Sequence, residues 1–217
     1  MRPGSAPRGY APPPVELDHV LIAVTDLDAA ARELEGTHGL ASIRGGRHRD
    51  WGTANRIVPL GDTYLELVAV VDRGEAAASG FGRWVAGAAT DAGRPFAWAV
   101  RSDDLDAVAG RLALEAHAHS RDSPDGSQLS WRLAGLEAAT AEPPLPFFVQ
   151  WTGGTFPGRS ADPQPASIAR LSLRGDPARL SAWLGEHQLP IVTEPGPEPG
   201  VAELTLEDHG QSIILRG

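Results

Sequence analysis

A histidine and a glutamate stand in this sequence where the surrounding residues are strongly apolar. His19 opens the apolar run 20–24, and Glu66 lies inside a second apolar run further along the chain. Polar and charged groups of this kind are seldom buried without a partner, because burial removes their hydration. We therefore expect the two side chains to bind a ligand or each other. The structural alternative for Glu66 is an ion pair with Arg56 or Arg47.

The positions of these two residues within their predicted strands favour a shared site. Side chains alternate between the two faces of a strand, so His19 lies opposite Val20 and Ile22, which are suited to packing under a helix. In the later strand, Glu66 shares its face with Tyr64. We predict that His19 and Glu66 lie on one concave sheet face, with side-chain atoms within about 6 Å of each other.

A second group of polar and aromatic residues occupies the predicted hairpin 45–56, which contains Gly-Gly-Arg-His and Gly-Thr-Ala-Asn segments. Glycines permit tight backbone paths, and an aromatic wall with a few polar anchors is typical of small-ligand pockets. We interpret His48 as a third metal ligand or a general base, Trp51 as the wall, and Asn55 as an amide for a ligand carbonyl or hydroxyl. The alternative is that these are ordinary hairpin residues.

Together these segments resemble the vicinal oxygen chelate superfamily, and most closely its glyoxalase-like branch. The resemblance implies β-α-β-β-β modules that offer one metal ligand from the first strand and another from the fourth, the positions of His19 and Glu66. It also implies a divalent cation, and Zn, Mn, Ni and Fe are not separable from these ligands. The best-known metal sites of the superfamily take ligands from two modules.

The chain repeats the β-α-β-β-β pattern. Asp26, Asp104 and Asp176 each precede an apolar-periodic run, which is the signal of a helix N-cap. We predict an α+β fold in which two modules form a cup-shaped half-barrel sheet and a third copy follows. The predicted parts are a disordered Pro-rich tail (1–16), a glyoxalase-like domain (17–151, with modules 17–72 and 95–151 and connector 73–94), a linker (152–166) and the third module (167–217).

The second and third modules lack most of these polar residues. At the position matched to the glutamate, the second module has Gln150 and the third is apolar. We interpret Gln150 and Tyr64 as substrate-binding residues, and the missing second histidine argues against a complete two-module metal site. His117 and His119 form a His-x-His pair, which we assign to an exposed strand edge because no acidic residue follows at a helpful distance.

Composition excludes several functions. The 217 residues carry a formal net charge of -9 without a clustered basic stripe, which argues against nucleic-acid and anionic-membrane partners. There is no cysteine and no lysine, so thiolate and Schiff-base chemistry are excluded. The chain shows neither an apolar run long enough for a spanning helix nor a secretory signal, and we expect a cytoplasmic protein.

Three functions remain open at this stage. The first is a metal-dependent lyase, isomerase or oxygenase that uses His19 and Glu66, with His48 or Gln150 as a further group. The second is a metal-free protein that binds or sequesters a small, partly aromatic compound. The third is a degenerate dimerising scaffold, because the third module must either pack on the flank of the cup or pair with its copy in a second chain, and we slightly favour the dimer.

Overall fold

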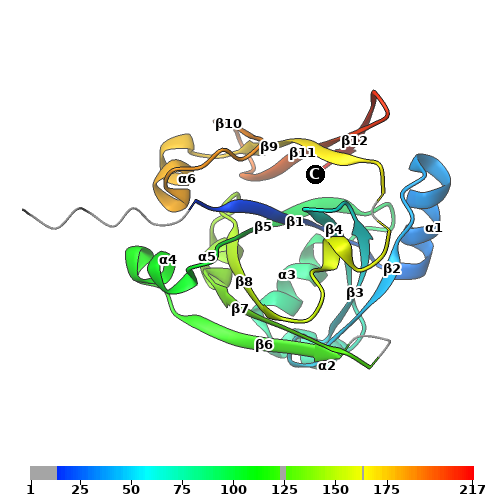
Figure 1. Ribbon diagram of the computed structural model, residues 1–217, viewed down its shortest axis with the longest axis horizontal. Helices are drawn as coiled ribbons and strands as arrows, with labels where there is room; N and C mark the ends of the chain where they lie inside the picture. The colour runs from blue at the N-terminus through cyan, green and yellow to red at the C-terminus, as the bar shows by residue number, and fades with distance from the viewer. Residues whose placement is uncertain (1–13, 123–125, 163) are drawn as a thin grey trace, which may run out of the picture.

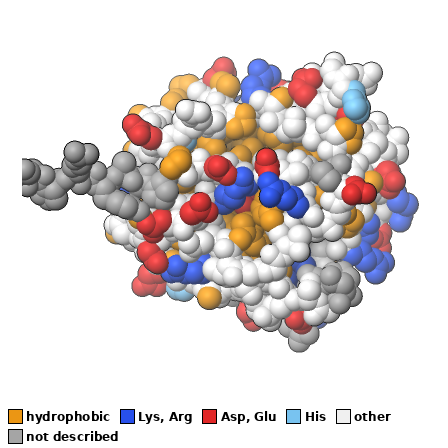
Figure 2. All heavy atoms as spheres, in the orientation of Figure 1, with side chains coloured by type: hydrophobic (Ala, Val, Ile, Leu, Met, Phe, Trp, Pro, Cys, Tyr) orange, Lys and Arg blue, Asp and Glu red, His pale blue; other side chains and the backbone are white. Residues whose placement is uncertain are grey.

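The computed structural model describes residues 14–122, 126–162 and 164–217. Most of the predicted tail lies outside these residues. Within them, no helix is long and apolar enough to cross a membrane. Charged side chains of both signs are interspersed on the face shown in Figure 2.

The first two modules form one curved sheet (Figure 1), as predicted. β1 of the first module pairs antiparallel with β5 of the second, which gives the strand order β2-β3-β4-β1-β5-β8-β7-β6. The first module contains β1 (Glu16–Ala23), α1 (Leu27–His38), β2 (Ile43–His48), β3 (Thr53–Pro59) and β4 (Tyr64–Val70). The second contains β5 (Arg94–Arg101), α4 (Leu105–Leu112), β6 (Ala116–Asp122), β7 (Gln128–Ala134) and β8 (Phe147–Gly153).

The three predicted helix starts are confirmed. The Asp26 carboxylate accepts hydrogen bonds from two backbone N–H groups of the first turn of α1, and Asp104 and Asp176 each accept one at the starts of α4 and α6 (Pro177–Leu184). Each carboxylate satisfies donors that the helix leaves unpaired and interacts favourably with the positive end of the helix dipole. The caps therefore fix where each strand ends and its helix begins.

The connector and one inserted helix shape the inside of the cup. Residues 73–94 contain α2 (Arg73–Ala78) and α3 (Gly80–Ala88), and α3 packs Phe81 and Val85 into the concave face. α5 (Leu136–Ala141) interrupts the second module between β7 and β8, where the first module has only a tight turn at Gly61. The sequence pattern did not predict this helix.

The third module has the predicted element order but a different strand pairing. It consists of β9 (Ser167–Arg174), α6, β10 (Ile191–Glu194), β11 (Gly200–Asp208) and β12 (Gln211–Arg216), in the sheet order β10-β9-β11-β12. In the first two modules the strand before the helix pairs with the last strand, whereas β9 pairs with β10 and β11. β10 is short and is followed by a Pro-rich loop, residues 195–199, and it pairs parallel to β9 instead of forming a hairpin with β11.

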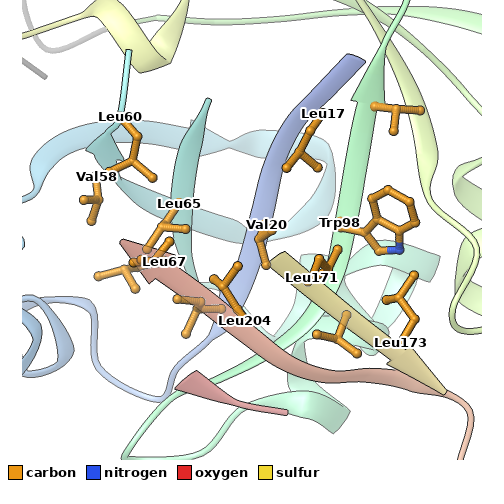
Figure 3. Packing of buried hydrophobic residues seen from close by; sticks show 14 of the residues in the cluster. Leu17, Val20, Val58, Leu60, Leu65, Leu67, Trp98, Leu171, Leu173 and Leu204 are labelled. Carbon is orange, nitrogen blue, oxygen red and sulfur yellow. The ribbon is translucent and has the colours of Figure 1, made fainter. Parts of the chain in front are cut away.

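This four-stranded sheet covers the convex face of the cup (Figures 1 and 3). Leu171 and Leu204 point toward Val20, Leu65 and other side chains of the large sheet in one continuous core. Burial of such side chains is worth roughly 1.5–3 kcal/mol each. The third module therefore packs against the cup of its own chain, which is the first of the two arrangements considered from sequence.

We expect this shared core to be essential for stability. Leu204 is fully buried, so Leu204→Ala should lower the free energy of unfolding by about 2–5 kcal/mol, while Ile214→Ala, at a side chain of the same sheet that is 46% exposed, should change it by less than about 0.5 kcal/mol. Urea unfolding measures both.

Deletion of residues 167–217 should give aggregated protein, since Trp98 and Val20 lose their cover. A monodisperse two-module protein in size-exclusion chromatography would contradict this account.

Candidate functional site

The concave face holds a narrow cavity, and the empty space in it together with that of its open mouth amounts to about 490 Å³. One wall carries most of the polar groups, and the remaining lining is aromatic or aliphatic. α3 contributes Phe81, and Pro157 comes from a short 3-10 turn, η2 (Pro157–Arg159), in the linker. The lining residues are His19, Leu21, His48, Trp51, Asn55, Ile57, Tyr64, Glu66, Phe81, Arg121, Leu129, Trp131, Leu133, Leu136, Phe147, Val149, Trp151 and Pro157.

The linker turn is held firmly against the β3–β4 hairpin. The backbone N–H of Gly61 donates to the carbonyl of Gly158 at 2.9 Å. A Cβ at position 158 would lie only 2.5 Å from the carbonyl oxygens of Gly61 and Thr63, so only glycine fits there without displacing the hairpin. Pro157 is thereby fixed as part of the cavity wall.

The predicted proximity of the two central residues is confirmed. His19 Nε2 lies 3.3 Å from Glu66 Oε2, and both side chains are buried. The other ring nitrogen, Nδ1, lies 2.6 Å from Asp18 Oδ1, and Trp151 Nε1 donates to Asp18 Oδ2 at 2.8 Å. Asp18 is the extra residue of a β-bulge in β1, between the pairs that Leu17 and His19 make with β5. A bulge redirects side chains, and here it brings the aspartate beside the histidine.

Asn55 holds Glu66 from the other side. Its Oδ1 accepts from the backbone N–H of Gly46 at 2.8 Å, which leaves Nδ2 to donate to Glu66 Oε1 at 2.7 Å. The amide is therefore used within the protein, and it positions the carboxylate instead of facing a ligand carbonyl as we expected. The ion pairs of Glu66 with Arg47 or Arg56, which were the structural alternative, do not form among the described residues, since those arginines pair with other carboxylates.

His48 lies at the cavity wall next to this chain of hydrogen bonds. Nδ1 is 3.1 Å from Thr53 Oγ1, and Nε2 is 3.5 Å from Asn55 Nδ2. Desolvation lowers the pKa of His48 to about 4; Glu66 opposes this shift and the charge of Arg121 adds to it. A side chain with such a pKa is a weak general base near neutral pH, so the geometry favours a neutral imidazole that accepts or donates hydrogen bonds.

The two aromatic residues predicted for the site line the cavity. Trp51 contacts Phe81 with ring centroids 4.7 Å apart, and Tyr64 stacks on His19 at 4.5 Å with an interplanar angle of 16°. Burial raises the pKa of Tyr64 well above its usual value, and the charges of Asp18 and Glu66 raise it further. A hydrogen bond between the phenol and the Asp18 carboxylate contributes to this raised pKa, so the phenol stays protonated and belongs to the same network as His19.

Gln150 was placed wrongly. It lies outside the cavity, where Nε2 donates to the carbonyl of Asp103 and Oε1 accepts from Arg132. Its neighbours along β8, Val149 and Trp151, are the residues that line the cavity. Because side chains alternate along a strand, Gln150 must point to the opposite face.

The true counterpart of Glu66 in the second module is an aromatic residue. Leu21 and Ala99 lie at the same distance before the caps of their helices, and their parallel partners are Glu66 and Phe147. The inserted helix α5 changes the spacing between the strands, which is why matching by sequence selected Gln150 instead. Phe147 packs edge-on to His19, with ring centroids 5.7 Å apart.

The residues present do not fit a cation held by the protein alone. Two ligands of one metal ion can lie 3.3 Å apart, as His19 Nε2 and Glu66 Oε2 do. Most protein zinc sites, however, have three or four protein ligands. Across residues 14–122, 126–162 and 164–217, no group of three or more His, Cys, Asp or Glu side chains is arranged to hold a metal ion. The Nε2 atom of His48 faces Asn55 instead of the His19–Glu66 pair.

Sequence analysis missed three kinds of residue at the site: the bulge residue Asp18, the aromatic residues Trp131 and Trp151, and Arg121. We had assigned β6 to an exposed edge. His117 is exposed, but His119 is half-buried, with its ring centroid 5.1 Å from that of Trp51. The burial of one face of β6 could have been predicted from β7, because the alternating apolar residues of β7 pair with residues of β6 that lie on the same face of the sheet.

Comparison with known proteins identifies the class of this chain. The model of the glyoxalase-like domain family matches residues 17–188, so the chain belongs to that family, within the vicinal oxygen chelate fold. No protein of curated function matches the sequence.

The similarity to solved structures lies at low sequence identity. A hypothetical protein from Staphylococcus aureus is 15% identical, with a TM-score of 0.68, over 92% of this chain and 98% of its own. That coverage extends into the four-stranded sheet. Methylmalonyl-CoA epimerase from Mycobacterium tuberculosis is 21% identical over 64% of this chain and 88% of its own, with a TM-score of 0.43. A hypothetical protein from Bacillus halodurans is 12% identical over 65% and 96%, with a TM-score of 0.44.

We predict that Gly45→Ala disturbs the site through Asn55. A Cβ at position 45 would lie 1.9 Å from Asn55 Oδ1, so the amide must move and release Glu66. The free energy of unfolding should fall by about 1–3 kcal/mol. Gly36→Ala is the matched control, because its Cβ meets nothing within 4 Å and the helix should gain about 0.4–1 kcal/mol.

A double-mutant cycle tests the cause of this loss. Asn55→Ala removes the atom that the new Cβ would strike, so the effects of Gly45→Ala and Asn55→Ala should be strongly non-additive in urea unfolding. Additive losses would show that Gly45 is required for another reason.

The lowered pKa of His48 predicts a direction for acid sensitivity. Folding favours the neutral imidazole, so this contribution to stability is complete above the unfolded pKa of about 6.5 and is lost as the pH falls toward 4. His48→Gln should flatten the dependence of the melting temperature on pH between about 6.5 and 4. NMR titration of the His48 ring gives the pKa directly, and a midpoint at or above 6 would refute this assignment.

Proposed function

We propose that the protein binds a small, partly aromatic organic molecule in the cup without a metal held by the protein. The observation that carries this proposal is a buried His19–Glu66 pair, fixed by Asp18 on one side and Asn55 on the other, facing a cavity of aromatic side chains. Concave apolar sites with a few fixed polar groups are the usual form of small-ligand sites.

The geometry of the pair indicates what the polar wall offers a ligand. The short Nδ1 contact to Asp18 makes Nδ1 a donor, so Nε2 faces Glu66 either with a proton on one of the two groups or with a cation between them. In the metal-free case, the two groups face each other directly at 3.3 Å. A ligand hydroxyl or carbonyl that enters beside the pair can donate to Glu66 or accept from His19.

A metal-dependent enzyme is the second candidate. The observation in its favour is the Asp18–His19 contact, because histidines that ligate metals usually donate their other ring N–H to a carboxylate or carbonyl. When bound, such a cation would polarise oxygen atoms of the substrate. This candidate requires water or substrate at every coordination position beyond those of His19 and Glu66.

Metal analysis separates the two candidates. We expect protein purified without a histidine tag to contain only sub-stoichiometric Zn, Mn, Ni or Fe by plasma mass spectrometry. Each of these cations should change the melting temperature of the wild type and of Glu66→Gln equally. Stoichiometric metal that disappears in Glu66→Gln would support the enzyme candidate instead.

A ligand screen tests the binding proposal itself. Small aromatic acids, amides and alcohols should raise the melting temperature of the wild type by preferential binding to the folded state. Glu66→Gln should reduce this rise without lowering the melting temperature of the free protein. Glu115→Gln, whose side chain is 90% exposed, is the control and should behave as the wild type does. A large loss of stability in Glu66→Gln would assign this carboxylate to the scaffold.

A further inference from the structure

A buried arginine without a complete set of partners lies on the wall of the cavity. Arg121 is 8% exposed, and its Nη1 has no hydrogen-bond partner among residues 14–122, 126–162 and 164–217. In the same part of the chain, no carboxylate forms an ion pair with its guanidinium. Leaving a buried charged donor unpaired costs free energy, so the arrangement is complete only when an acceptor binds there.

The backbone holds this guanidinium in place. A Cβ at position 46 would lie 2.8 Å from Nη1 and 2.9 Å from Cδ of Arg121, so Gly46 leaves the space that the side chain occupies. β6 also pairs with β7 through Arg121 and Leu129, which directs both side chains to the same face. The arginine is therefore seated between β2, whose pairing with β3 shifts register between Arg44 and Arg47, and the cavity, and is not extended into solvent.

Arg121 also separates the cavity from a second, outer hollow. Arg121, Ile57, Leu129 and Pro157 line both spaces. The described lining of the outer hollow includes Arg44 as a second cation and contains no acidic side chain. In a chain of net charge -9, this local excess of positive charge marks the boundary as a place for an anion.

The charge of Arg121 reaches the central residues. It lowers the pKa of His48, and it opposes the rise in the pKa of Tyr64 that burial and the nearby carboxylates cause. Glu66 in turn favours the charged form of Arg121, against desolvation, which lowers the pKa of the guanidinium. A ligand in the cup would thus have the carboxylate of Glu66 and the cation of Arg121 within electrostatic reach.

We propose that the ligand is an organic anion whose carboxylate pairs with Arg121 while its apolar ring lies among the tryptophans of the cup. This inference rests on the proposed function and adds the chemical class of the ligand. Arginine suits the role because its planar fork binds a carboxylate through two parallel hydrogen bonds. Aromatic contact area inside the cavity and a charged contact at its boundary together orient such a molecule.

The test compares an acid with its neutral isostere. Phenylacetate and phenylacetamide have the same ring and differ in charge, and their binding to the full chain can be followed by quenching of tryptophan fluorescence, since Trp51, Trp131 and Trp151 line the cavity. We expect the acid to bind at least about tenfold more tightly than the amide. Arg121→Gln should remove this preference, and Arg121→Lys should retain part of it. Arg32→Gln, an exposed arginine on α1, should behave as the wild type does.

Each outcome has a defined meaning. Equal binding of acid and amide to the wild type overturns the inference and leaves the proposed function standing. A preference for the acid that survives in Arg121→Gln also overturns it. If neither probe binds, both the proposed function and the inference fail. If Arg121→Gln does not fold, Gly46→Ala serves instead, because it displaces the guanidinium without removing its charge. For the inference to hold, Gly46→Ala must weaken the binding of the acid more than the binding of the amide.

Discussion

The antiparallel pairing of β1 with β5 is the interaction on which the remaining structure depends. It joins two modules, each with one buried face, into a single curved sheet whose concave side becomes a cavity and whose convex side needs a cover. The bulge in this pairing also places Asp18 beside His19. The same strand junction therefore accounts for the enclosure of the site and for the orientation of its central histidine.

The repeated pattern and the strand parity were sufficient to predict the fold and part of the site. Side-chain alternation correctly brought His19 and Glu66 together, because a period of two depends only on local backbone geometry. The matching of Gln150 to Glu66 was wrong because α5 changes the spacing within the second module, and sequence spacing carries no information on strand register. Arg121 was missed because its strand looks polar throughout, and only its pairing with β7 reveals the buried face.

The hydrogen bonds around Glu66 show how the polar wall is kept in a single arrangement. Asn55 is oriented by a backbone N–H, Asp18 by an indole N–H, and the two carboxylates enclose the imidazole between them. A buried network of this kind is stable only when its members are satisfied. Arg121 is the exception at the wall, because its Nη1 has no hydrogen-bond partner among the described residues. The proposed chemical class of the ligand follows from this one unpaired cation beside a satisfied network.

The linker turn at Pro157 and Gly158 belongs at once to the cavity wall and to the segment that leads into β9. The wall of the cavity and the covering sheet are consequently connected through this one short segment. Loss of the C-terminal strands would therefore free one end of the segment that carries this part of the wall, and the Gly61–Gly158 hydrogen bond would have to hold it against the hairpin from one side.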